Sequence, residues 1–306
     1  MRKKTMIIVS SITFSLIAVL AVLFIASGIF SNPQYLEPWK KTYSQQFADP
    51  RIRLASHGLL AANGHNMQPW KIRLDKQNPM AFYLYADSDR LTKEVDPFAR
   101  QTMISQGTFL EYVRVAGNKL GYKTNIVLFP NGSYDEQKLT NSMKNKPVAK
   151  ITLTKIDTQS SPLYNFMFLP DTNRAAYQPI QLTSEQLNRL QAINTDEDIV
   201  IRIFQSNNDI KKLGDFALKG AEIESGIHRI NKESADIFRA NEYQKNKYRF
   251  GFSVEGQGTS GIMKHVMQGN IDMPEEVLSS YLDIVLAGFH DGTGYNGTTI
   301  EENTNA

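Results

Sequence analysis

The feature that most constrains this chain is an uncharged run at its start, TMIIVSSITFSLIAVLAVLFIASGIF, which follows a basic cluster at residues 2–4. A helix needs about 20 apolar residues to cross a bilayer, so this run is long enough to span one. Ala26 and Gly28 resemble a signal cleavage site, which leaves a cleaved signal peptide as the alternative to an anchor. We favour the anchor because the run exceeds a usual signal core of roughly 7 to 15 residues. The basic cluster then places the rest of the chain on the extracytoplasmic side.

The rest of the chain carries balanced charge. The sequence contains 34 Lys plus Arg and 31 Asp plus Glu, and residues 1–30 hold three of the basic residues and none of the acidic ones. Removing that segment leaves 31 charges of each sign. A nucleic-acid partner is therefore not expected, because its electrostatic footprint is missing.

Several other classes of site are also not expected. Cysteine is absent from the chain, which excludes disulfides, thiol catalysis and cysteine metal ligands. The histidines form no HExxH pattern and no paired short spacing, so a metal site is not expected. GQGTSG, residues 256–261, satisfies GxGxxG, but no clear strand precedes it and no clear helix follows, so it indicates a flexible loop rather than a dinucleotide site.

Hydrophobic periodicity indicates mixed helices and strands after residue 50. Spacings of three and four predict helices over residues 51–62, 96–121 and 208–247, and alternation predicts strands over residues 70–75, 80–87, 124–130, 146–156 and 198–204. Shorter features are a helix end at residues 63–64, a turn at residues 172–174, a capping box from Thr183 to Gln186, and a helix over residues 274–287. The order of these elements is not a strict βαβ repetition, so the expected fold class is α+β.

Two glycines inside the helix predicted over residues 96–121 suggest close packing. A mid-helix glycine costs roughly 1 kcal/mol relative to alanine, so Gly107 and Gly117 indicate that something approaches that face. The simpler explanation is a neighbouring helix.

The stretch LLAANGHNMQPWKI combines amide side chains with a proline-stiffened bend. Pro69 disfavours helical backbone at the preceding residue, so Gln68 is expected on extended backbone. Asn66 and Gln68 then present neutral donors and acceptors. Such groups match the uracil-like edge of a flavin without placing net charge beside the ring. The alternative is an ordinary loop in which Trp70 is a core residue.

This stretch resembles the flavin-contacting motif of nitroreductase-family FMN oxidoreductases, in which a helix end of small residues precedes Asn, Gln, Pro and Trp. Two further stretches are similar to the Acg-like branch, in which two nitroreductase-type repeats are fused. DPFARQTMISQGTFLEYVRVAGNKLGY matches an Asp-Pro-x-x-Arg helix through Arg100, although Gln101 stands where an acid is common. DTNRAAYQPIQLTSEQLNRL matches the opening of the second repeat through Arg174, and YRFGFS resembles a later arginine-to-glycine step.

The resemblance implies a nitroreductase-like α+β fold with two fused repeats and one N-terminal transmembrane helix. The expected parts are a signal anchor (residues 1–30), a linker (31–50), a first repeat (51–160) and a second repeat (161–306). Related chains continue further than Ala306, so the second repeat is expected to be incomplete. The resemblance also implies noncovalent FMN, with hydride passing from NAD(P)H to a small oxidised acceptor. Two alternatives stay open: a non-enzymatic flavin-binding or storage protein, and an envelope scaffold without cofactor.

Roles for individual residues follow from the resemblance and from side-chain chemistry together. Arg174 is expected at the phosphate or ribityl part of FMN, because a guanidinium fork suits a dianion. Arg100 is expected either at the cofactor or in a structural ion pair. The residues expected to contact the cofactor are His65, Asn66, Gln68, Arg100, Gly107 and Arg174.

Overall fold

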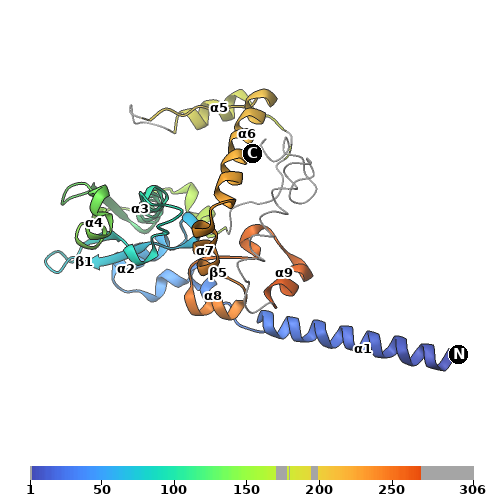
Figure 1. Cartoon of the computed structure of the whole chain (residues 1–306). Helices are drawn as coiled ribbons and strands as arrows, with labels where there is room; N and C mark the ends of the chain where they lie inside the picture. The colour runs from blue at the N-terminus through green and yellow to red at the C-terminus, as the bar shows by residue number, and fades with distance from the viewer. Residues whose placement is uncertain (1, 170–177, 179, 194–198, 270–306) are drawn as a thin grey trace. The chain divides into compact units, whose positions relative to one another are not determined.

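The computed structural model describes residues 2–169, 178, 180–193 and 199–269 (Figure 1). These residues form helices and strands together, which confirms the expected α+β class. The expected apolar helix is present as α1 (Arg2–Ser27), and its part from Thr5 to Ser27 is long and apolar enough to cross a membrane. The chain divides into two compact units, Met1–Thr172 with Asp236–Asp272, and Asn173–Ala235 with Met273–Ala306.

The first unit contains the strands that the structure describes and most of the described helices. Its helices, after α1, are α2 (Pro50–Gly58), α3 (Arg100–Leu120), α4 (Leu139–Asn145), α8 (Glu242–Tyr248) and α9 (Gly261–Gln268). Its strands are β1 (Trp70–Leu74), β2 (Ala81–Ala86), β3 (Tyr122–Leu128), β4 (Ala149–Lys155), β5 (Phe238–Arg239) and β6 (Phe252–Ser253). The second unit contains α5 (Ser184–Gln191), α6 (Asn207–Ser225) and most of α7 (His228–Ile237).

A four-stranded antiparallel sheet organises the first unit, with the strand order β1-β2-β4-β3. Side chains alternate across it, as expected for a sheet with one buried face. Phe82, Leu84 and Ile151 on the central strands are fully buried. On the opposite face, the Lys150 ammonium lies 5.1 Å from the centroid of the Tyr83 ring. The strands predicted over residues 70–75, 80–87, 124–130 and 146–156 are thereby confirmed within a few residues at their ends.

The core lies between the buried face of the sheet and the helices α2 and α3, which pack against each other (Figure 1). Leu54 of α2 and Phe109 and Val113 of α3 are fully buried there. Close packing is confirmed at Gly117, where a Cβ atom would lie 2.7 Å from the Tyr122 carbonyl oxygen of β3. The close neighbour is therefore a strand and not the expected helix.

The expectation of a close neighbour at Gly107 is wrong for the part of the chain that the structure describes. Gly107 is exposed on α3, and a Cβ atom there would meet nothing within 4 Å. The helical spacing placed it near the buried stripe, but the buried residues of α3 follow Thr102, Gln106, Phe109 and Val113 instead. A cofactor contact at Gly107 stays a prediction.

Two helix ends differ from the expectation. α2 ends at Gly58 instead of residue 62, and Asn63 is extended at φ −154°, so Asn63 and Gly64 do not cap it. α3 begins at Arg100, four residues after the expected capping acid. Asp96 still caps this helix from outside, because its carboxylate accepts the backbone N–H of Thr102 at 2.9 Å.

The residues between α1 and α2, expected as a linker, are folded. They form the 3₁₀ helices η1 (Gln34–Trp39) and η2 (Tyr43–Gln46). Trp39 packs against the core around the sheet, and the Tyr35 hydroxyl accepts a hydrogen bond from Lys245 Nζ at 3.0 Å. This segment therefore belongs to the first unit.

Expectations for the later part of the chain had mixed outcomes. The capping box is confirmed, with Thr183 and Gln186 hydrogen-bonded reciprocally at the start of α5. The strand predicted over residues 198–204 is wrong for the described residues 199–204, which are irregular and pair with no described strand. The turn at residues 172–174 and the helix at 274–287 lie outside the described residues. Whether residues 161–306 form a second repeat stays a prediction.

The helix predicted over residues 208–247 is also wrong as a single element. α6 ends before Gly226, and α7 gives way to β5, whose Phe238 pairs in parallel with Phe252 of β6. The side-chain pattern of a helix is present on both sides of β5, because α7 precedes it and α8 follows it. The pairing of β5 with β6 interrupts the helix between them.

Candidate functional site

The stretch between α2 and β1 forms a bend at residues 64–69 whose backbone is unusual. Three of its non-glycine residues are left-handed: His65 at φ 50°, Asn66 at 52° and Gln68 at 48°. Such conformations are uncommon for side-chain-bearing residues and persist where the surroundings hold them. The expectation of extended backbone at Gln68 is therefore wrong.

Hydrogen bonds from neighbouring residues account for this conformation. The Asn63 side-chain oxygen accepts the backbone N–H of Gln68 at 2.7 Å, and the Gln68 carbonyl accepts the N–H of Trp70 at 2.8 Å. Ser105 of α3 accepts the Gly64 N–H through its hydroxyl at 3.1 Å. Together these bonds offset the steric preference that Pro69 imposes on the residue before it.

A segment from the far end of the first unit, residues 249–253, meets the bend directly. The Gly251 N–H donates to the Asn66 carbonyl at 2.9 Å, and the Asn66 amide Nδ2 donates to the Gly251 carbonyl at 3.0 Å. The rings of His65 and Phe252 lie 6.1 Å apart. The Asn66 side-chain amide therefore already has a hydrogen-bond partner within the chain, the Gly251 carbonyl.

Gly251 is suited to this contact because of its own backbone. Its φ is +91°, and a Cβ atom there would lie 2.0 Å from the Ile237 carbonyl oxygen. Only glycine fits a position with this φ and this close a backbone neighbour. The YRFGFS stretch therefore has a defined structural role in bringing residues 249–253 to the bend.

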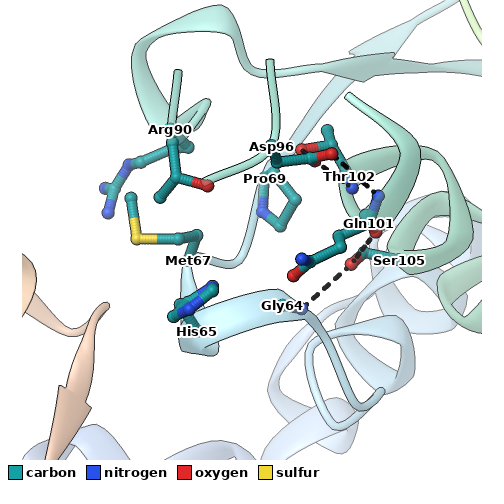
Figure 2. A pocket seen from close by; sticks show the side chains of 10 residues that line it. Gly64, His65, Met67, Pro69, Arg90, Asp96, Gln101, Thr102 and Ser105 are labelled. Carbon is teal, nitrogen blue, oxygen red and sulfur yellow. Dashed lines mark hydrogen bonds between the residues drawn. The ribbon is translucent and has the colours of Figure 1, made fainter. Parts of the chain in front are cut away.

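Beside the bend lies a small hollow, drawn in Figure 2. One side is formed by Gly64 and by Asp96, Gln101, Thr102 and Ser105 around the start of α3. The other side carries His65, Met67, Pro69 and Arg90. The hollow has room for about one water molecule, which is too little for a three-ring heterocycle. A flavin could therefore be held only against the outer surface of this bend.

Arg90, which follows β2, is the positive group at this site. Its guanidinium lies 3.4 Å from the centroid of the Phe250 ring, and its Nη1 is buried without a hydrogen-bond partner among the described residues. Burial lowers the pKa of Arg90, against the raising effect of Asp87 and Asp89. An arginine normally makes several hydrogen bonds, so the Nη1 without a partner is an unused donor on a residue that lines the hollow.

Arg90 was not among the predicted site residues. The signal that could have indicated it is its place in DSDR, directly after a buried strand that runs back toward the bend. Trp70 pairs with Ala86 in the sheet, so the end of β2 must return close to the beginning of β1.

The remaining predicted contacts are Gln68, Arg100 and Arg174. Gln68 is half-buried, and its side chain makes no hydrogen bond within the described chain. Arg100 is exposed, and its guanidinium lies 5.8 Å from the Phe98 ring with no carboxylate partner in the described ranges, so the alternative of an ion pair is not seen there. Arg174 lies outside the described residues. The structure thus brings together His65, Asn66 and Gln68, and adds Arg90 and Gly251 beside them.

Comparison with protein-family models and with curated protein sequences found no match. Among the described residues, no group of three or more His, Asp or Glu side chains could hold a metal ion. The chemistry on offer at the bend therefore consists of an amide, an imidazole and a guanidinium. These groups suit recognition of a planar ligand with carbonyl and N–H groups or a negative charge.

Proposed function

We propose that the chain is a membrane-anchored, extracytoplasmic α+β protein of the nitroreductase type that binds FMN noncovalently at the bend of residues 64–69. The observation that supports this best is a pair of polar groups without hydrogen bonds in the described chain, the Gln68 amide and the Nη1 of Arg90. Gln68 lies within the strained backbone and Arg90 lines the hollow beside it. This backbone is held by the Ser105 hydroxyl of α3 and by the backbone of Gly251. The resemblance of the NGHNMQPW stretch supplies the identity of the ligand.

The residues present fit this ligand in part. The Gln68 amide offers a donor and an acceptor to the ring edge, and His65 stays a predicted ring contact. Arg90 supplies a positive charge for the electron-rich part of the ligand. Asn66 does not fit as a ring contact while its amide binds Gly251, so we assign it to positioning of the bend. Arg100, Gly107 and Arg174 stay predicted contacts.

Bound FMN would supply two-electron transfer from NAD(P)H to a small oxidised acceptor. The part of the chain is to bind and orient the ring. His65 and Gln68 would act on its polar edge, and residues 249–253 would limit access of water to one side of the bend.

The proposal predicts a flavin-binding protein that depends on Gln68. The full chain, purified in detergent, should show flavin absorption or acquire it on titration with FMN. Replacing Gln68 with alanine should weaken FMN binding by about 1–3 kcal/mol, or about 5-fold to 150-fold in Kd, if its amide pairs with the ring edge. The matched control is Gln77→Ala, in the exposed turn between β1 and β2, which should bind FMN as the unmodified chain does. Unchanged FMN affinity in Gln68→Ala would remove the role of this residue.

A second candidate function is supported by the pairing of Gly251 with Asn66. This pairing and the Phe252 ring beside His65 already use part of the bend, as expected for a cofactor-free envelope scaffold. A colourless protein that ignores added FMN would favour this candidate. A yellow protein that is not reduced by NADH or NADPH under anaerobic conditions would instead indicate flavin binding without turnover.

A further inference from the structure

The helix α9 has two faces of opposite character. Lys264, His265 and Gln268 point toward the rest of the first unit, whereas Ile262, Met263 and Val266 share the other side of the helix. Ile262 is 71% exposed and Met263 is 59% exposed. An apolar helix face of this kind, left open in the described chain, normally marks a surface for a partner or a membrane.

The side of α9 that carries His265 packs against the end of α1. The His265 ring lies 5.8 Å from the Phe24 ring, and its Nδ1 lies 3.4 Å from the Ser27 hydroxyl. A Cβ atom on Gly269 would come within 2.7 Å of the Leu23 carbonyl oxygen, so the two backbones nearly touch. These contacts place α9 alongside the last turn of α1 (Figure 1), with its C-terminal end nearer the middle of the apolar run.

Buried polar contacts hold α9 in this orientation. Gln268, fully buried, donates to the Glu242 carboxylate at 3.3 Å, and Lys264 lies 3.4 Å from the same carboxylate. Lys245 forms ion pairs with Glu242 and Glu255 in the same cluster. Rotating α9 to bury its apolar face would break these contacts and leave charges unpaired, which is strongly unfavourable.

The position of α9 beside the last turn of α1 indicates what covers the apolar face of α9. The apolar part of α1 ends at Ser27, so its last turn lies where a spanning helix leaves the hydrocarbon. Phe30, just beyond, is 86% exposed, so an apolar surface continues past the end of this helix. The exposed side of α9 is therefore continuous with a surface that is itself in lipid.

We propose that α9 is a membrane-interface helix, with Ile262, Met263 and Val266 inserted into the outer leaflet next to α1. This inference rests on the membrane anchoring in the proposed function. It adds to the membrane anchoring by α1, because α9 would hold the first unit against the bilayer surface as a second apolar element. A helix that lies in the interface in this way buries one apolar face and keeps its polar face toward protein or water.

The absence of cysteine makes the test direct. Full-length single-cysteine variants, Ile262→Cys and separately Met263→Cys, would carry an environment-sensitive fluorophore in phosphatidylcholine and phosphatidylglycerol vesicles. Both labels should lose most of their fluorescence to nitroxide lipids and little to iodide in the water. Ile104→Cys on α3, also 69% exposed, should be quenched by iodide and not by the nitroxide lipids.

A third position separates the inference from the anchoring on which it rests. Phe14→Cys, in the middle of α1 and 74% exposed, should be quenched by nitroxide lipids alone. If Phe14→Cys behaves so while both α9 labels respond to iodide, the interface helix is overturned and the anchor stands. If both α9 labels resist both quenchers, protein covers this face and the inference is also overturned. If Phe14→Cys itself responds to iodide, the anchor fails and the α9 inference fails with it.

Discussion

At the scale of single residues, His57 of α2 shows how burial determines protonation. Its side chain is 1% exposed, with Nδ1 2.9 Å from the Arg53 carbonyl oxygen and Nε2 3.1 Å from the Tyr164 hydroxyl. A carbonyl oxygen only accepts, so Nδ1 carries the proton and Nε2 accepts from Tyr164. Burial lowers the pKa of His57 below its ordinary 6.5, so the folded protein keeps this ring neutral.

The lowered pKa predicts a loss of stability in acid. Below the ordinary pKa of 6.5, the unfolded chain binds a proton at His57 that the folded chain does not. The free energy of unfolding should therefore fall as the pH decreases from 6.5 toward the lowered folded-state pKa. Urea unfolding at pH 7.5, 6.5 and 5.5 should show a shallower pH dependence in His57→Gln than in the unmodified chain. The control is Gln77→Ala, at an exposed position without a titratable group, which should keep the full dependence. Equal slopes for His57→Gln and the unmodified chain would contradict the prediction.

At the scale of elements, the contact between α2 and α3 depends on a glycine that faces an aromatic ring. A Cβ atom on Gly58 would lie 2.2 Å from the Phe109 ring, which is fully buried. The ring cannot give way easily, because it also packs against Trp70 with ring centroids 5.2 Å apart. Gly107 on α3 is the opposite case, exposed and with open space around it among the described residues.

These two glycines predict opposite effects of the same substitution. Gly58→Ala should lower the free energy of unfolding by about 1–3 kcal/mol, because the added methyl group overpacks the contact with Phe109. Gly107→Ala should raise it by up to about 1 kcal/mol, since alanine favours the helix and meets no neighbour. Denaturant unfolding of both variants measures the difference. Destabilisation in Gly107→Ala would indicate a close neighbour that the described residues do not show.

At the scale of the whole molecule, the sign of charge around α1 predicts which side of the membrane the remainder of the chain occupies. The basic cluster at residues 2–4 precedes the apolar helix, and the segment after it is balanced in charge. Basic residues next to a spanning helix stay on the cytoplasmic side. The bend and the sheet would then lie outside the cytoplasm, where NAD(P)H is scarce. Binding of FMN on this side of the membrane therefore does not by itself imply turnover with NAD(P)H.

Orientation can be measured in intact cells with single-cysteine variants. Lys76→Cys, in the exposed turn between β1 and β2, should react with a membrane-impermeant maleimide without lysis. Lys3→Cys, which keeps the other basic residues of the cluster, should react only after lysis. A labelled Lys3→Cys chain of full mass would also show that the apolar helix is retained and not cleaved. Labelling of Lys76→Cys only after lysis would reverse the proposed orientation.

Local patterns were sufficient for the elements whose stability comes from their own residues and one buried face. Alternation predicted the four strands of the sheet, the Thr183 capping box was predicted correctly, and the apolar run was identified as a helix able to span a membrane. In these cases the side-chain period, the caps and the apolar length act within a few residues. The polar side chains of the bend could also be identified from the sequence, because Asn66 and Gln68 lie next to Pro69 in one short stretch.

Long-range contacts decided the rest. The left-handed backbone at Gln68, the commitment of the Asn66 amide and the position of Arg90 against Phe250 all depend on residues that periodicity does not connect. Asn66 and Gly251 are 185 positions apart. The pairing of Phe238 with Phe252 likewise interrupts the helix that the sequence pattern predicted over residues 208–247. Such partners are chosen by the free energy of the packed chain, in which a hydrogen bond between distant segments can outweigh the local preference of either one.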